Sequence, residues 1–179
     1  MIEWSGLRGW IQKVSELNEL TTIKEPVDWD EEAAAVTYLT GKTVGSPALL
    51  FEHIKDSAAG FSVLMNILGS SLNRVGLTLG LPTPSTVLEL IEGAKDIFKR
   101  RIAPVLVDKN RAPINENLLF DDKIDLGVFP APRMWPHDGG RYIGTADIII
   151  TRSPDDGHLN LGTYRQMVIS KNQVGFYVS

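Results

Sequence analysis

The first hundred residues alternate between helical and strand-like hydrophobic patterns. Apolar residues from Leu7 to Leu17 recur at helical spacing behind Ser5, a residue type that caps helix N-termini. Spacing and capping residues predict three more helices: from Asp28 or Asp30 to about Gly41, from Ser71 to Leu79 with Gly80 closing it, and from Ser85 or Thr86 with Glu89 as capping-box partner. Short apolar runs predict strands at 21–24, 48–51 and 62–67. Strands alternating with helices favour an α/β layer up to about Val107.

The pattern changes after Asp108. Residues 108–125 are polar and loop-like, and the prolines of 129–136 predict an extended connector without helix. Beyond it, strand-like runs at 143–151, 158–169 and 174–178 are separated by turn sequences, which predicts an antiparallel meander. We therefore expect an α/β (α+β) protein with an N-terminal α/β domain at 1–115. A second domain is expected at 116–179, with its sheet continuing beyond Ser179.

Composition narrows the classes of function. The net charge is −4, and the one basic cluster, Lys99 to Arg101, lies where it offsets a helix dipole, so nucleic acid or an anionic membrane is not expected as the main partner. No apolar run approaches the ~20 residues needed to span a bilayer. The chain has no cysteine, which removes thiolate chemistry and fits a reducing compartment. Without a visible signal peptide, we expect a cytoplasmic location.

Polar residues suited to ligand binding gather between Gly139 and Gln166. Arg165 offers a planar, permanently charged fork that can donate two parallel hydrogen bonds to a carboxylate, although many such arginines are simply exposed or ion-paired. Asn160 offers a neutral oxygen of the kind that Mg²⁺ and Mn²⁺ accept, although it also fits a turn.

Three smaller residues complete this group. Thr145 and Thr163 can donate hydroxyl hydrogens to a phosphate, or be ordinary strand threonines. Gly162 allows close approach of a ring to the backbone, or marks a bulge. His137, in the loop beside them, is a weaker candidate for contact with a ligand.

Side-chain parity tests whether this group forms one site. Asn160 and Arg165 are an odd number of residues apart, so a regular strand would direct them to opposite faces. A shared site requires the strand to break register between them, and Gly162 is the natural place for a bulge. We therefore predict that residues 161–164 depart from regular strand geometry.

Four segments together resemble the UbiD family of prenylated-flavin-dependent decarboxylases. They are Pro47–Glu52, Asn73–Gly80, Gly139–Thr145 and Asn160–Gln166, in family-like order and spacing over nearly the whole chain. Members of that family are well over twice this length, so the chain resembles an N-terminal portion.

The resemblance implies a site for prenylated FMN in a split β-barrel, of which residues 116–179 would form the first strands. It also implies a divalent metal, Mn²⁺ or Mg²⁺, and K⁺ at the phosphate. By motif position, Asn160 resembles the metal-ligating asparagine, and Arg165 resembles the arginine of a catalytic Arg-Glu-Glu set. Thr145, Gly162 and Thr163 resemble positions that line the flavin and its phosphate. The other metal ligands and both catalytic glutamates would lie beyond Ser179.

The implied activity is that of a carboxy-lyase. It is reversible, non-oxidative decarboxylation or carboxylation of an aromatic or α,β-unsaturated acid, with this chain inactive alone. An alternative is a non-catalytic subunit or interaction module that completes a flavin-dependent (de)carboxylase complex. A flavin-reductase-like barrel with ordinary FMN is a third possibility, unsupported by the first hundred residues. A homo-oligomer, or a partner subunit that supplies the remaining site residues, is expected.

Overall fold

The computed structural model describes residues 2, 4–103 and 105–177. It combines helices with small sheets, which confirms the α/β class. The chain divides into two compact units, each assembled from separate stretches. The first unit comprises 1–21, 40–49 and 65–121, and the second comprises 22–39, 50–64 and 122–179. The predicted domain boundary near residue 115 stays a prediction.

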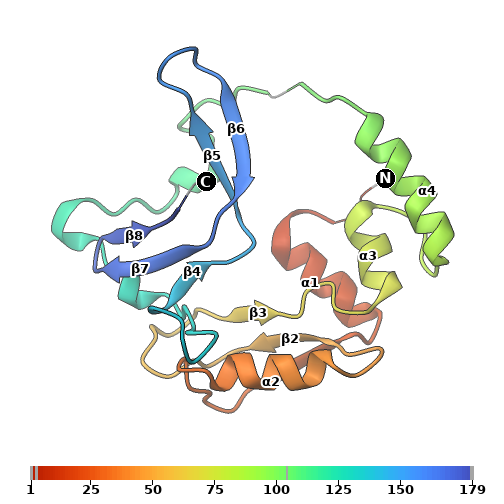
Figure 1. Cartoon of the computed structure of the whole chain (residues 1–179), viewed down its shortest axis with the longest axis horizontal. Coiled ribbons are helices and arrows are strands. Elements are labelled where there is room, and N and C mark those ends of the chain that lie inside the picture. The colour runs from red at the N-terminus through yellow and green to blue at the C-terminus, as the bar shows by residue number, and fades with distance from the viewer. Residues whose placement is uncertain (1, 3, 104, 178–179) are drawn as a thin grey trace. The chain divides into compact units, whose positions relative to one another are not determined.

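Three helices of the first unit begin where the sequence predicts, and one of them also ends at the predicted residue, Leu79. They are α1 (Gly6–Glu16), α3 (Leu72–Leu79) and α4 (Val87–Lys99), shown in Figure 1. Ser71 caps α3 by accepting a hydrogen bond from the backbone N–H of Arg74, and Gly80 closes it at φ 67°, in the left-handed region. Thr86 and Glu89 form the predicted capping box of α4.

Fewer residues of these helices are buried than their apolar patterns predict. Trp10 and Val14 are the buried residues of α1, and the indole of Trp10 donates to the hydroxyl of Thr78 at 2.9 Å. In α4 the buried residue is Leu90, whereas the large apolar side chains of Leu88 and Phe98 are exposed. The described residues of the first unit thus leave one face of α4 uncovered.

A three-stranded sheet has the order β1-β2-β3, and the division between the two units passes through it. Its strands are β1 (Leu20–Ile23), β2 (Ala48–Phe51) and β3 (Val63–Met65). Ala48, Leu49 and Phe51 are buried, as expected for a short apolar central strand. The strand predicted at 62–67 is shorter than the pattern indicated.

One buried ion pair organises the first unit. The side chain of Arg74 is fully buried, and its guanidinium lies 2.9 Å from the carboxylate of Glu19. Its other N–H groups donate to the backbone oxygens of Ile67 at 2.8 Å and Ser46 at 2.7 Å. Burial raises the pKa of Glu19, but hydrogen bonds from Ser71 and Asn73 and the charge of Arg74 bring that pKa below its ordinary value. A buried guanidinium is tolerated here because every side of it is paired.

The second unit contains most of the helix α2 (Glu32–Gly41), up to Leu39, and the strands of the C-terminal region. These are β4 (Tyr142–Gly144), β5 (Ile148–Arg152), β6 (Leu159–Thr163), β7 (Gln166–Ser170) and β8 (Gln173–Gly175). They form a sheet of order β4-β7-β8 and a separate β5-β6 pair, all antiparallel. Single 3₁₀ turns lie at η1 (Pro113–Asn115) in the first unit, at η2 (Asp121–Lys123) on the division between the units, and at η3 (Leu126–Val128) in the second unit. Residues 129–136 are extended without helix, as predicted.

Two of the predicted strands were too long. The runs 143–151 and 158–169 each divide into two strands that belong to different sheets, with breaks at 145–147 and 164–165. The pairing register shifts across the two breaks, because the break at 145–147 contains more residues than the break at 164–165 on the partner run. The hairpin therefore bends, and Figure 1 shows β5 and β6 leading away from the β4-β7-β8 sheet.

The predicted bulge at Gly162 was also wrong in its position. Strand β6 pairs with β5 in unbroken register from Leu159 to Thr163, with Gly162 opposite Ile149. The departure from strand geometry begins one residue after Thr163, at Tyr164 and Arg165. The break therefore lies where the chain passes from one sheet to the other, and not at Gly162.

Among the described residues, none of the helices combines the length and apolar character needed to cross a membrane.

Replacing Glu19 with Gln leaves the guanidinium of Arg74 buried without its counter-ion. We expect the free energy of unfolding to fall by about 3 kcal/mol, as for loss of one partner of a buried pair. Urea denaturation measures it. Glu16→Gln is the matched control, since Glu16 pairs with Lys13 at 2.9 Å on the exposed side of α1, and should cost less than about 0.5 kcal/mol. Equal losses in the two variants would contradict the need for a counter-ion.

The same carboxylate predicts sensitivity to acid. The pKa of Glu19 is lowered from 4.5 in the folded chain and returns to its ordinary value on unfolding. Its stabilising contribution is present above that value and is lost as the pH falls through the lowered pKa. Below pH 4.5, the free energy of unfolding should fall more steeply for the natural sequence than for Glu19→Gln. Urea denaturation at stepped pH compares the slopes, and parallel curves would refute the prediction.

Candidate functional site

Arg141 fixes the start of the glycine-rich segment 139–145. Its half-buried guanidinium donates to the backbone oxygens of Ala131 at 2.6 Å and Phe129 at 3.1 Å, and lies 4.8 Å from the ring centre of Trp29. Burial lowers the pKa of Arg141, and the charge of Asp56 partly opposes that shift. These contacts join the extended connector to β4. They fix the backbone at Arg141 and therefore the position of the next residue, Tyr142.

A cavity of about 420 Å³ opens beside β4, β7 and β8. It is lined by Tyr142, Thr163, Arg165, Met167, Gly175, Phe176 and Tyr177. Tyr142, Met167 and Gly175 are directly opposite one another in the sheet, so they share a face. A side chain at Gly175 would meet that of Ile169, whose Cδ1 lies 3.2 Å from where a Cβ would be. Arg165, two residues before Met167 and outside the ladder, lines the same cavity.

Arg165 lies against an aromatic ring. Its guanidinium carbon is 5.3 Å from the ring centre of Tyr142, within the range of a cation–π contact. The side chain is exposed and forms no hydrogen bond or ion pair with another residue of 2, 4–103 and 105–177. Its edge N–H groups are thus open to a ligand.

Asn160 lies in different surroundings. Its amide nitrogen donates to the hydroxyl of Tyr164 at 3.3 Å, and its amide oxygen has no hydrogen bond from the part of the chain that the structure describes. The ring of Tyr164 occupies the space that a Cβ at Gly162 would need, so this glycine is covered by the protein's own side chain. Neither Asn160 nor Gly162 lines the cavity that contains Arg165.

The structure thus brings together only part of the predicted group. Thr163 and Arg165 line one cavity, whereas Thr145 is exposed in the crossing from β4 to β5. His137 is also exposed, in the turn before Gly139. The assignment of these residues to one site stays a prediction.

Two residues at the cavity and bend were not singled out from the sequence. Tyr142 gives no local signal, because its partner Arg165 lies far along the chain, between β6 and β7. Asp147 accepts a hydrogen bond from the side chain of Gln166, and its carboxylate lies where a Cβ at Gly144 would be. Its other oxygen is buried without a described partner. In the sequence, the only sign of this contact is that Gly144 and Asp147 are separated by two small residues.

Within the described ranges, no three His, Asp or Glu side chains are grouped so that they could hold a metal ion. Asn160 offers a single neutral oxygen, and Mg²⁺ and Mn²⁺ bind several oxygen ligands at once. The described residues therefore do not make a divalent-metal site by themselves.

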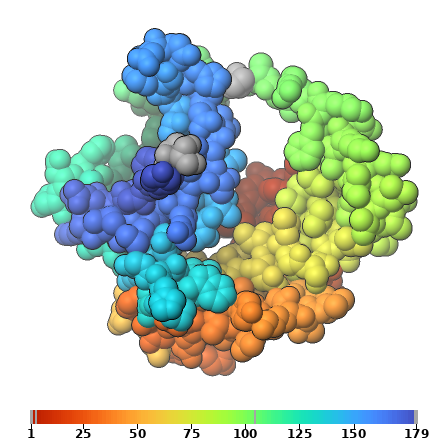
Figure 2. Space-filling model, viewed as in Figure 1, coloured from red at the N-terminus to blue at the C-terminus, as the bar shows by residue number. Residues whose placement is uncertain are grey.

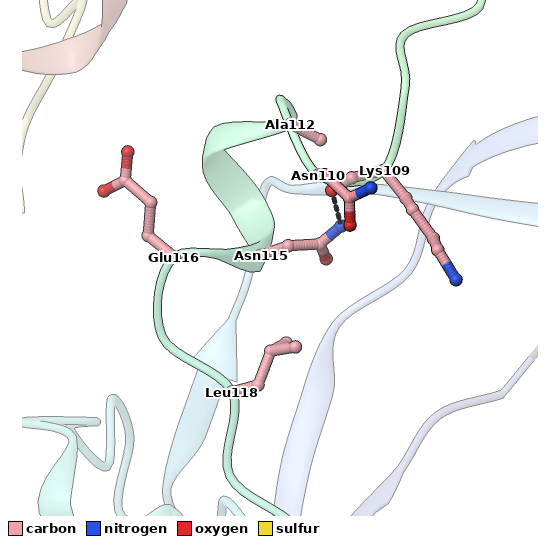
Figure 3. A pocket seen from close by; sticks show the side chains of 6 residues that line it. All are labelled: Lys109, Asn110, Ala112, Asn115, Glu116 and Leu118. Carbon is pink, nitrogen blue, oxygen red and sulfur yellow. Dashed lines mark hydrogen bonds between the residues drawn. The ribbon is translucent and has the colours of Figure 1, made fainter.

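A second cavity, of about 530 Å³, lies in the first unit around η1. Its lining residues are Lys109, Asn110, Ala112, Asn115, Glu116 and Leu118. Figure 3 shows Asn115 donating to the backbone oxygen of Lys109, while the ammonium of Lys109 and the carboxylate of Glu116 point away from each other. All six residues come from one short loop, and no polar groups converge in it, so this cavity is the weaker candidate.

Two family models match the chain. Residues 11–93 match UbiD_N, described as the 3-octaprenyl-4-hydroxybenzoate carboxy-lyase N-terminal domain. Residues 105–179 match UbiD, described as the 3-octaprenyl-4-hydroxybenzoate carboxy-lyase Rift-related domain. Together they cover most of the chain.

Individual proteins agree with these matches. The chain is 33% identical over 186 residues to a phenolic acid decarboxylase of Streptomyces sp. (strain D7), covering 97% of this chain and 37% of the relative. It is similar to the closed form of vanillic acid decarboxylase from Sedimentibacter hydroxybenzoicus, with 30% identity and a TM-score of 0.83 over 95% of this chain and 36% of that one. It is also similar to the UbiD-class enzyme HmfF from Pelotomaculum thermopropionicum in complex with prFMN, with 26% identity and a TM-score of 0.79 over 97% and 38%. The chain spans little more than a third of the length of these proteins.

Gly162→Ala should displace the ring of Tyr164, because the new methyl group would overlap it. We expect loss of the Asn160–Tyr164 hydrogen bond and destabilisation by about 1 kcal/mol. The side-chain amide signals of Asn160 in NMR spectra and thermal unfolding measure the two effects.

The control for this change is the same substitution in a Tyr164→Ala background. There the added methyl group has no ring to meet, so Gly162→Ala should cost little. An equal cost in both backgrounds would mean that the Tyr164 ring is not what excludes a side chain at Gly162.

Proposed function

Because the chain belongs to the UbiD family, we propose that it forms the N-terminal α/β part and the opening strands of the flavin-binding barrel of a decarboxylase. The reaction is reversible, non-oxidative loss of CO₂ from an aromatic or α,β-unsaturated carboxylic acid. The observation that carries the proposal is Arg165, whose edge N–H groups are unpaired among the described residues beside an aromatic-lined cavity.

Arg165 binds and orients the substrate carboxylate. A guanidinium matches a carboxylate with two parallel, charge-assisted hydrogen bonds, and this pairing fixes the plane of the acid as well as its position. The rings of Tyr142, Phe176 and Tyr177 give the cavity flat apolar walls, which suit the remainder of an aromatic acid. Oriented in this way, the bond to the departing carboxylate has one fixed direction.

The aromatic walls of the cavity and the names of similar proteins both support the proposed substrate class. Two similar proteins are named for phenolic acid and vanillic acid, and both names describe aromatic carboxylic acids. We propose an aromatic acid as the first substrate class to test, and an unsaturated acid as the second.

Prenylated FMN is the proposed cofactor, because HmfF was solved with prFMN. When bound, it supplies the electron sink for loss of CO₂. Thr163, which lines the cavity, is proposed to donate its hydroxyl to the cofactor, and Thr145 lies exposed at the bend. The ring of Tyr164 over Gly162 must move before a flavin can approach that backbone. These residues fit a flat, anionic group only in part.

The metal and potassium proposals fit less well. Asn160 is proposed to contribute one ligand to Mn²⁺ or Mg²⁺, since its amide oxygen has no described partner. With no carboxylate or imidazole grouped near it among the described residues, the chain needs further ligands from elsewhere. No step of the reaction is assigned to the metal or to K⁺.

The β5-β6 pair has an exposed aliphatic face, which indicates that additional polypeptide covers it. Ile148, Ile150, Leu159 and Leu161 lie on one face of the β5-β6 pair and are each 47–66% exposed. Figure 2 shows the surface of this hairpin in blue, standing open on the side turned to the viewer. Contiguous apolar surface of this kind marks an interface. We propose that later residues of a longer chain, a second copy or a partner subunit cover it. The alternative, a non-catalytic subunit that completes a flavin-dependent complex, uses the same face.

The test compares chain 1–179 with the product of the whole natural reading frame, each supplied with prenylated FMN and assayed for CO₂ release from aromatic and unsaturated acids. We expect activity only in the longer product. A reading frame that ends at Ser179 would favour the subunit alternative, and assay with candidate partners would follow. Turnover by 1–179 alone would overturn the proposal that essential groups come from elsewhere.

Arg165→Lys should lower kcat/KM of the active form by about 10- to 100-fold, because an ammonium cannot replace the two parallel hydrogen bonds. Arg152→Lys is the matched control. Arg152 is exposed on β5, donates to the backbone oxygen of Gly157 at 3.2 Å and does not line the cavity. Its kcat/KM should be unchanged. Equal effects of the two substitutions would remove Arg165 from the site.

A further inference from the structure

We infer that Tyr142 is a positioning residue whose ring holds one face of the Arg165 guanidinium and so presents the edge N–H groups to an anion in the cavity. The inference rests on the proposed function, since it concerns the same arginine and the same cavity. It assigns a role to a tyrosine that carries no catalytic chemistry of its own.

Tyr142 is a fixed support. Its backbone N–H donates to the backbone oxygen of Pro132 at 2.9 Å, and it pairs with Met167 in the sheet. The preceding residue, Arg141, is held by two further hydrogen bonds to the connector. The half-buried ring of Tyr142 therefore has a defined place from which to contact another side chain.

Arg165, in contrast, has little else to hold it. It lies in the two-residue crossing between β6 and β7, outside both ladders, and is exposed. An unrestrained arginine side chain loses much rotamer freedom when it binds a ligand. The ring of Tyr142, 5.3 Å from the guanidinium carbon, is the one contact recorded for this guanidinium among the described residues. That contact reduces the freedom still to be lost on binding.

The contact leaves the donors of Arg165 uncommitted. A ring against the face of a guanidinium does not use the N–H groups, which lie in its plane, and those of Arg165 form no hydrogen bond with a described residue. Two other arginines differ from Arg165 in their N–H groups, although Arg141 also lies against a ring, that of Trp29. The N–H groups of Arg74 bind Glu19 and backbone oxygens, and those of Arg141 bind backbone oxygens. These two arginines hold the fold together, whereas Arg165 is held in place with its donors uncommitted.

The charge of the cavity agrees with an anionic ligand. Among the residues that line it, Arg165 is the only charged one, and the other six have hydroxyl, thioether, aromatic or hydrogen side chains. An anion that enters would meet no opposing carboxylate from the lining, and would pair with the guanidinium at its open edge.

The experiment uses chain 1–179 with ¹⁵N-labelled arginine. Relaxation of the Arg165 Nε–H reports the order of the guanidinium, and titration with benzoate reports its availability to an aromatic carboxylate. Tyr142→Leu removes the ring. Tyr142→Phe keeps it and loses only the hydroxyl, which makes no hydrogen bond with the described residues. Val174→Leu is the matched control, because Val174 lies on β8 of the same sheet and does not line the cavity.

We expect Tyr142→Leu to lower the order of the Arg165 Nε–H and to weaken benzoate binding about two- to fivefold, the range for an exposed cation–π contact. Tyr142→Phe should keep the order of the Nε–H, and Val174→Leu should leave both unchanged. Unaltered backbone amide signals of β7 in Tyr142→Leu confirm that the sheet persists. If those signals change, Tyr142→Phe and Tyr142→Met replace it, with order expected only in the former.

The outcomes separate the two proposals. Arg165 that stays equally ordered in Tyr142→Leu, with benzoate bound as in the natural sequence, overturns the role of Tyr142 and leaves the proposed function intact. Loss of order in Tyr142→Leu, together with no benzoate binding by the natural sequence up to its solubility, supports the positioning contact. That second result counts against Arg165 as the carboxylate-binding residue of the proposed function.

Discussion

The bend between the β4-β7-β8 sheet and the β5-β6 pair is the constraint on which the candidate site depends. Residues 145–147 and the pair Tyr164–Arg165 lie outside both ladders. An arginine inside a regular ladder would be flanked by side chains from neighbouring strands, whereas Arg165 is flanked by a ring on one side and open space on the other. The bend has a cost, because one oxygen of Asp147 is buried there without a described partner. Such local costs are typical of functional sites.

Local chemistry made most of the first hundred residues predictable. Ser71 and Gly80 bound α3, and Thr86 bounds α4, because caps and left-handed glycines act through residues only a few positions apart. The central strand at 48–51 is likewise a short apolar run between clear breaks. In the candidate site, the same reasoning identified Arg165 and Thr163 as residues with suitable chemistry, and both line the cavity.

The remainder depends on contacts between distant parts of the chain. The hydrophobic run from 143 to 151 carries no signal for a change of sheet, because both halves have strand composition and the partner strand decides where pairing stops. Gly162 looked like the bulge, yet the register shift is set by the lengths of both strands together. Tyr142 meets Arg165 only after the hairpin has folded. Parity required a break only if Asn160 and Arg165 share a site, and it gave no position for that break.

The threading of the chain through its two compact units has a consequence for synthesis on the ribosome. Each unit draws on three separate stretches, so the first cannot close before residue 121 has emerged, and the second waits for residues beyond 122. Residues 22–39 and 50–64 therefore lack their partners in the second unit until residues beyond 122 have been translated. Long-range closure of this kind is slow and leaves apolar strands temporarily open to other molecules. Efficient production of this protein will thus depend on elongation rate and on chaperone capacity as much as on final stability.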